Sequence, residues 1–313
     1  MEEQSTGLQK LLHNVAAYDG DFKKWEARAQ KIIKRYRDDN RSQNTNETAK
    51  FNILWSNVQT LIPAVYARLP KADVSRRFGD NDQVGRVASL LIERALDFEI
   101  EHYPDFRQTM KHAVEDRFLG GRGTAWVRYE PHVNAVDMPK DGLEVTEDID
   151  EPEEGVQNDP TAGQEPMEEI EYECAPIDYV HWKDFGHSVA RTWEEVTAVW
   201  RWVYMTREAL VERFGDEVGE KIPYDAGPDT LKQYGQSTKE HTRAKICEYW
   251  CKESGKVYWF SKSMPSIIDE RDDPLELEGF FPCPQPLYAT MTSDTLVPVA
   301  DFVLYQDQAN ELD

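Results

Sequence analysis

The stretch DRFLGGRGTAWV, residues 116–127, marks the point at which the chain changes from helix to strand. Before it, apolar residues recur every three or four positions from Pro104 onward, which is the period of an amphipathic helix. The two glycines at 120–121 are typical of residues that end helices. From Gly123 the apolar period becomes two, as in a strand. The stretch therefore predicts an α+β fold that is helical before this point and rich in strands after it.

Three further helices are expected in the helical part, residues 1–122. Asp19 or Asp21 is expected to cap the first, because a carboxylate there can accept hydrogen bonds from the first backbone N–H groups. Pro63 interrupts the second helix, residues 49–68, and predicts a kink or break. Their apolar stripes are Phe22, Trp25, Ala29, Ile32 and Tyr36 in the first helix, Phe51, Leu54, Trp55, Val58, Leu61, Ile62 and Val65 in the second, and Val84, Val87, Leu91, Ala95 and Phe98 in the third, which begins at Asp82.

The second part, residues 123–300, is expected to hold mixed, mainly antiparallel strands and short helices. Alternating aromatic residues predict a half-buried strand with an aromatic face. The expected strands are 124–130, 170–179, 199–204, 244–250 and 256–260, the last two forming a hairpin, and Thr206 is expected to cap a short helix over 207–214 that Gly215 ends. Residues 301–313 predict the start of a helix that the chain does not complete, which suggests a fragment of a longer protein.

The negative charge is concentrated in one segment. The chain has 313 residues and a net charge of -23. Residues 141–173 contain fourteen Asp and Glu and no Lys or Arg, so they carry -14 and the other 280 residues share -9. Because this segment has few large apolar residues, it buries too little to offset the entropy of ordering. We expect an acidic mobile excursion, either a solvated insertion or a docking site for a basic partner, and a smaller one at 269–274.

The sequence lacks the signals of membrane insertion, secretion and disulfide bonding, and this indicates the cellular compartment in which the chain folds. No uninterrupted apolar run reaches the roughly 18 residues that a membrane-spanning helix needs. The opening residues MEEQ have neither the basic nor the apolar part of a secretory signal. The four cysteines do not follow the spacing of a disulfide framework. We therefore expect folding in cytosol-like conditions, free thiols and no membrane partner.

Motifs for catalysis and for metal or nucleotide binding are weak. The glycines at 119–123 run from a helix into a strand, whereas a phosphate loop runs from a strand into a helix N-terminus. Cys247 and Cys251 have the spacing of half a zinc site, but buried thiols in a sheet explain them more simply. The acids at 19–23 lie at an expected helix cap rather than at rigid strand ends. We predict no catalytic residue, no metal and no cofactor.

Nucleic-acid binding is expected to be local at most. Affinity for DNA comes largely from neutralised phosphates, and a chain at -23 repels them at long range. The basic helix face from Lys23 to Arg41 is most simply a solvated surface, although it can make local contacts. The other candidates for such contacts are Arg68, Lys71, Arg76 and Arg77.

Several blocks of the sequence resemble one family. The run FNILWSNVQTL at 51–61, followed by Pro63, Tyr66, Pro70 and Lys71, resembles the opening signature of the portal proteins of tailed bacteriophages, especially the large portals of short-tailed phages. The stretch at 116–127 is similar to the passage from helix to strand in that family. The same order continues through the blocks at 179–185, 193–214, 247–250 and 286–308.

The resemblance implies a non-enzymatic structural subunit of a ring, usually of twelve copies, at one vertex of the capsid. A terminase motor drives double-stranded DNA through such a ring, and the DNA passes without specific binding. This chain would supply mainly the wing, which faces the capsid and scaffolding proteins, with residues 301–313 opening the stem helix. The terminase and head-completion or adaptor proteins would bind regions beyond Asp313. The expected location is the virion, after assembly in the host cytoplasm.

Two other classes stay open at this point. One is a metal-dependent phage enzyme, such as a nuclease, that uses the carboxylates or cysteines. The other is an acidic adaptor or scaffold-like binding module in which the segment 141–173 is the working part.

Six residues are candidates for an interface. Phe51, Trp55 and Tyr66 belong to the block that carries the resemblance, and as aromatic residues they are also candidates for the core. Lys31, Lys34 and Arg35 lie on the basic face of the first helix. A closed ring uses head-to-tail contacts and therefore needs two different, complementary patches. The basic face and the acidic segment are one such pair.

Reversal of the basic patch tests this pairing. Replacing Lys31, Lys34 and Arg35 by Glu should impair assembly, and the loss should depend on salt, because salt screens charge attraction between exposed groups. Sedimentation at low and high ionic strength measures it. Assembly that is unchanged at both salt concentrations would contradict the pairing of the basic face with the acidic segment.

Overall fold

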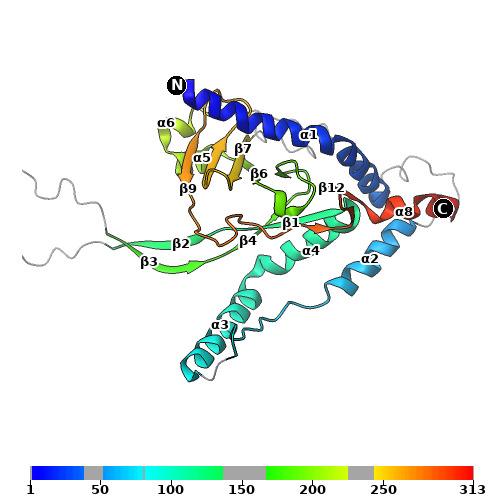
Figure 1. Cartoon of the computed structure of the whole chain (residues 1–313), viewed down its shortest axis with the longest axis horizontal. Helices are drawn as coiled ribbons and strands as arrows, with labels where there is room; N and C mark the ends of the chain where they lie inside the picture. Colours follow the sequence, from blue (N-terminus) through cyan, green and yellow to red (C-terminus); the bar gives the residue numbers. More distant parts are fainter. Residues whose placement is uncertain (1, 39–51, 80–81, 137–166, 225–242, 313) are drawn as a thin grey trace, which may run out of the picture. The chain divides into compact units, whose positions relative to one another are not determined.

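The computed structural model describes residues 2–38, 52–79, 82–136, 167–224 and 243–312, which form a mixed α+β fold with a helical N-terminal region and antiparallel sheets (Figure 1). The chain divides into two compact units, residues 128–176 and the remainder, each described by itself below. The helices are α1 (Glu2–Arg37), α2 (Ile53–Val65), α3 (Gln83–His102), α4 (Pro104–Leu119), α5 (Arg207–Phe214), α6 (Asp216–Gly219) and α8 (Asp301–Leu312), with a 3-10 turn η2 (Trp193–Glu195). The strands are β1 (Arg122–Val127), β2 (Glu130–Val136), β3 (Met167–Cys174), β4 (Ile177–Val180), β5 (Phe185–His187), β6 (Ala198–Met205), β7 (Ala244–Cys251), β8 (Lys256–Phe260), β9 (Asp269–Asp272), β10 (Leu287–Tyr288), β11 (Thr290–Thr292) and β12 (Thr295–Val299).

The smaller unit is an antiparallel pair of strands. β2 pairs with β3 from Glu130 opposite Cys174 to Val136 opposite Met167. Most of the expected acidic excursion, 141–166, lies outside the described residues. Its end, residues 167–173, lies in β3 and pairs with β2.

A five-stranded antiparallel sheet, ordered β5-β6-β7-β8-β9, is the centre of the larger unit. The predicted hairpin is confirmed, with Cys251 opposite Lys256. The excursion expected at 269–274 is wrong in its first part, because Asp269–Asp272 is the edge strand β9. Lys256 Nζ lies 2.5 Å from Glu270 Oε1 on this strand. Charged side chains on an exposed edge oppose pairing with other chains.

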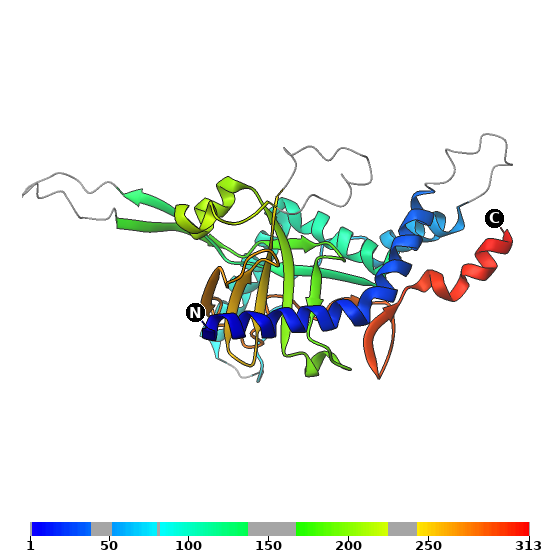
Figure 2. The ribbon, with the colours of Figure 1, turned by 90° about the horizontal axis from the view of Figure 1, so that it is seen from above.

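Helix α1 runs through the positions where a helix start was expected, so the predicted caps at Asp19 and Asp21 are wrong. The reason is packing: α1 lies across the five-stranded sheet (Figure 2), and its apolar stripe begins well before residue 19. Burial along the whole stripe outweighs the local capping preference of two aspartates. The buried residues of α1 on this face of the sheet are Leu8, Leu11, Val15, Tyr18, Phe22, Trp25 and Ala29, and they pack with Trp200, Trp202, Cys247, Tyr249 and Phe260.

The opposite face of the sheet is covered as well. A second cluster of buried residues joins Val199, Ile246 and Trp250 of the sheet to Trp126 of β1 and Phe280. The aromatic face expected on β6 is present, but the strand is buried on both sides over residues 198–200 rather than half-buried. Local alternation could not predict this, because the covering residues come from distant parts of the chain.

Helix ends follow the sequence closely where a polar cap is present. Asp82 accepts hydrogen bonds from the backbone N–H groups of Val84 and Gly85, and Thr206 accepts one from Ala209. α2 contains Pro63 and ends two residues later. Within the described residues, no helix combines the length and the apolar character that crossing a bilayer requires.

The stretch DRFLGGRGTAWV, residues 116–127, joins α4 to the centre of a small sheet, ordered β10-β1-β4. Gly121 ends α4 with φ of +90°, a conformation that side chains disfavour. At Gly123 a Cβ atom would lie 1.7 Å from the carbonyl oxygen of Ala113, so only glycine lets β1 approach α4 this closely. β1 ends at Val127, earlier than the predicted 130, and the expected strand 170–179 is divided between β3 and β4.

Between these two glycines, Arg122 is wholly buried. Its Nη1 donates to the Tyr18 hydroxyl at 2.7 Å, and its Nη2 donates to the carbonyl oxygens of Trp182 and Phe185, both at 3.0 Å. The guanidinium also lies 4.8 Å from the ring centre of Trp25. A buried cation costs stability unless hydrogen bonds and aromatic faces replace its hydration. Here it ties α1 and the segment at 182–185 to β1.

Loss of this guanidinium should destabilise the fold. Arg122→Ala removes the donors of two buried carbonyls and leaves a cavity, so the free energy of unfolding should fall by about 3–5 kcal/mol. Urea unfolding followed by tryptophan fluorescence measures the change. Arg191→Ala is the matched control, because Arg191 is exposed and pairs only with Glu195 on the surface. Equal stability of the two variants would contradict the role given to Arg122.

Candidate functional site

Helix α3 carries an apolar face that nothing in the described residues covers. None of its residues is buried. The predicted stripe of Val84, Val87, Leu91, Ala95 and Phe98 is present on one face of the helix, and all five residues are exposed. A stripe at intervals of three and four residues is the pattern with which helices usually face a core. The stripe is therefore a candidate interaction surface.

The rest of the molecule contacts the other side of α3. Glu93 accepts a hydrogen bond from the backbone N–H of Val74, and Asp97 accepts one from that of Ala72. Gly85 lies against the Arg76 side chain, which would clash with a Cβ atom there. At about 100° per residue, positions 85, 89, 93 and 97 point away from the apolar stripe. The extended segment after α2 thus holds α3 by its polar face and leaves the apolar face outward.

The five predicted interface residues that the structure describes lie in two places. Phe51 lies outside the described residues. Lys31 and Lys34 are exposed near the C-terminal end of α1, and Arg35 is partly buried there. Trp55 is half exposed near the start of α2. This end of α2 lies close to the end of α1, because Asn52 accepts a hydrogen bond from Trp55 N and donates to the carbonyl oxygens of Arg35 and Tyr36. Tyr66 lies just beyond the other end of α2, about 16 Å away along the helix.

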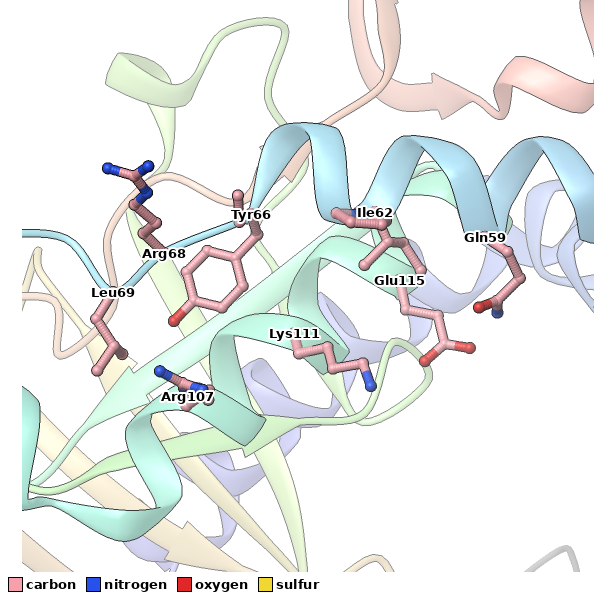
Figure 3. Close-up of a pocket in the computed structure, with 10 residues that line it drawn as sticks. Gln59, Ile62, Tyr66, Arg68, Leu69, Arg107, Lys111 and Glu115 are labelled. Carbon is pink, nitrogen blue, oxygen red and sulfur yellow. The ribbon is translucent and has the colours of Figure 1, made fainter.

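Tyr66 lines a cavity of about 390 Å³ between α2 and α4 (Figure 3). Arg107, Lys111 and Glu115 enter it from successive turns of α4, and Arg68 comes from the segment after α2. Arg68 belongs to the basic cluster noted in the sequence, whereas no sequence pattern singled out Arg107 and Lys111. Their spacing of four residues placed them on one helix face, but only the packing of α2 against α4 brings that face to Tyr66.

Cys247 and Cys251, which have the spacing of half a zinc site, lie on β7 of the five-stranded sheet. Cys247 lies in the layer of the sheet that faces α1, with Cys251 partly buried beside it. Burial raises the pKa of the Cys247 and Cys283 thiols, which keeps them protonated. Within the described ranges, no three His, Cys, Asp or Glu side chains are placed to hold a metal ion.

Asp116 is a buried carboxyl group in contact with Tyr179. The Tyr179 hydroxyl donates a hydrogen bond of 2.5 Å to Asp116 Oδ2. Desolvation raises the pKa of Asp116 from 3.8 to about 7, although this hydrogen bond opposes the shift. Desolvation lowers the pKa of the buried His187 from 6.5 to about 3, and the charge of Arg122 adds to this effect. Both side chains are buried, and His187 also lines a cavity of about 380 Å³ together with Asp21 and Glu195.

No protein-family model matches the chain, and no curated protein sequence matches it.

The pKa of Asp116 predicts a change of stability with pH. Because the folded pKa lies above the ordinary value, the group favours folding at low pH, and this contribution is lost as the pH rises from about 4 to about 7. Asp116→Asn removes that dependence. Relative to the wild type, the variant should gain stability between pH 4.5 and pH 7.5, by at most about 1.4 kcal/mol per pH unit. Urea unfolding at both pH values measures it, and the effect of His187 cancels in the comparison. A difference that does not vary with pH would refute the assignment.

Proposed function

We propose that this chain is a structural subunit of a homo-oligomeric ring, the portal of a tailed bacteriophage, and that it supplies the wing region. The observation that carries the proposal is the apolar stripe on α3, which the described residues hold outward and leave uncovered. Soluble monomers rarely expose a continuous apolar surface of this kind, and such surfaces mark protein interfaces. The function supported best is therefore assembly rather than catalysis.

The length and the position of the apolar stripe on α3 favour an interface between identical subunits. α3 is about 30 Å long, and its stripe runs over most of that length. Backbone N–H groups of Ala72 and Val74, in the extended segment after α2, donate to Asp97 and Glu93, so this segment lies along the polar side of α3 and not over the stripe. In a head-to-tail ring each copy offers such a face to a different patch of its neighbour.

Two sequence features support a portal among possible assemblies. The first is the block at 51–71, with the later blocks in the order of the family. The second is the charge, because an acidic wall lets a polyanion pass without holding it. Under this proposal the subunit lies at the capsid vertex of the virion, contacts the capsid and scaffolding proteins, and conducts double-stranded DNA for packaging and ejection. Terminase and head-completion proteins bind other regions of the complete subunit.

A charge placed in the stripe tests the proposal. Val87→Glu should weaken self-association by about ten- to a hundredfold, because the carboxylate must lose its hydration on entering an apolar interface. Val189→Glu is a matched control, since Val87 and Val189 are 57% and 59% exposed and Val189 lies outside α3. Sedimentation velocity gives the oligomeric state, and negative-stain images show whether the particle is a ring. Equal behaviour of both variants, or a wild type that stays monomeric at all concentrations, would refute it.

A further inference from the structure

We propose that the cavity between α2 and α4 is a binding site for a phosphate group. This site is separate from the apolar stripe on α3 and does not depend on the chain being a portal subunit. Its residues come from two helices and the segment that follows α2 (Figure 3).

The cavity gathers positive charge in an acidic protein. Three basic side chains, Arg68, Arg107 and Lys111, line it, against one carboxylate, that of Glu115. In the part of the chain that the structure describes, none of the three makes a side-chain hydrogen bond or an ion pair, while many other basic residues, such as Arg117 and Arg201, pair with carboxylates. All three side chains are exposed and therefore hydrated in the free protein, and together they make this cavity positive in a chain of net charge -23.

Tyr66 supplies a donor that has no partner. Its hydroxyl oxygen is buried, and it forms no hydrogen bond among the described residues. Buried polar atoms are almost always hydrogen-bonded, so an unsatisfied one beside a cavity points to a missing partner. Figure 3 shows this hydroxyl directed toward Arg107, on the α4 side of the cavity. Burial raises the pKa of Tyr66, so the phenol keeps its proton and can donate to an oxygen atom.

The charge and the donors fit phosphate better than a carboxylate. Three cations and one carboxylate leave a net charge of +2 in the cavity, which matches the charge of a phosphate dianion. Arg107 and Arg68 each offer a planar set of N–H groups, and Lys111 offers a compact ammonium; both kinds of donor recognise phosphate. The Tyr66 hydroxyl points toward Arg107, so these two donors can reach the same oxygen-rich anion, while the exposed Arg68 and Lys111 add positive charge to the cavity (Figure 3).

The phosphate can come from two sources with the same chemistry. A free phosphate ion fits a cavity of about 390 Å³ with room to spare. A backbone phosphate of DNA presents the same oxygen atoms from a larger molecule, with one charge instead of two. Both would use the Tyr66 hydroxyl and the Arg107 guanidinium, so the same variants test both.

The experiment measures binding of inorganic phosphate and, separately, of a 12-base-pair DNA duplex, by calorimetry at constant ionic strength. Tyr66→Phe should weaken phosphate binding about five- to tenfold, because one buried donor is lost. The same variant should unfold at the same or a higher urea concentration than the wild type, since it removes an unsatisfied buried hydroxyl. Arg107→Gln and Lys111→Gln should weaken binding at least as much. Arg28→Gln and Lys10→Gln, on the exposed surface of α1, are the matched controls and should leave it unchanged.

Comparing inorganic phosphate with the DNA duplex shows which of the two sources supplies the phosphate group. Phosphate binding that depends on Tyr66, without such binding of the duplex, assigns the site to a free ion, and dependence in both assigns it to a DNA phosphate as well. The proposal is overturned if the Tyr66 and Arg107 variants bind both ligands like the wild type. It is also overturned if succinate binds as tightly as phosphate, because the cavity would then recognise carboxylates, such as those of an acidic protein segment.

Discussion

The buried guanidinium of Arg122 is the contact on which the arrangement of the larger unit depends. It lies where α1, β1 and the segment at 182–185 meet, and no carboxylate of the described residues forms an ion pair with it. Two backbone carbonyls, the Tyr18 hydroxyl and the faces of several aromatic rings replace its water. The Tyr18 hydroxyl in turn donates to the carbonyl oxygen of Phe185, so the guanidinium and this phenol form one connected set of buried hydrogen bonds. The glycines at 121 and 123 bring Arg122 there, one through its backbone conformation and the other by letting β1 approach α4.

Two helices of this protein carry the same kind of apolar stripe, but only one of the two stripes is buried. α1 buries its stripe against the aromatic face of the sheet, whereas α3 is held by its polar face and leaves its stripe exposed. The difference lies in the hydrogen bonds that orient α3. Hydrogen bonds from the backbone at 72 and 74 to Asp97 and Glu93 turn α3 so that its apolar face points outward. An amphipathic pattern predicts that the apolar face of a helix will be buried, but it does not predict whether the residues that bury it belong to the same chain.

Local signals predicted the elements well where the determinant is a few neighbouring residues. Asp82 and Thr206 cap their helices, Gly215 ends α5, and the hairpin at 251–256 has the expected pairing. The errors have one physical cause, which is that packing outweighs a local preference. The aspartates at 19 and 21 lie inside α1 because the stripe on either side of them is buried. The charged run at 269–272 forms an edge strand because β8 offers it unpaired backbone groups.

The sequence by itself determined the α+β composition, the change from helix to strand at residues 120–123, and the periods of the stripes, because each depends on residues close together in the chain. Only the tertiary structure decided which stripe is buried, that Arg122 is a core residue, and that Tyr66 meets Arg107 and Lys111 at one cavity. Each of these depends on residues that lie far apart in the chain, and the free energy that places them is that of burial, which no local pattern contains.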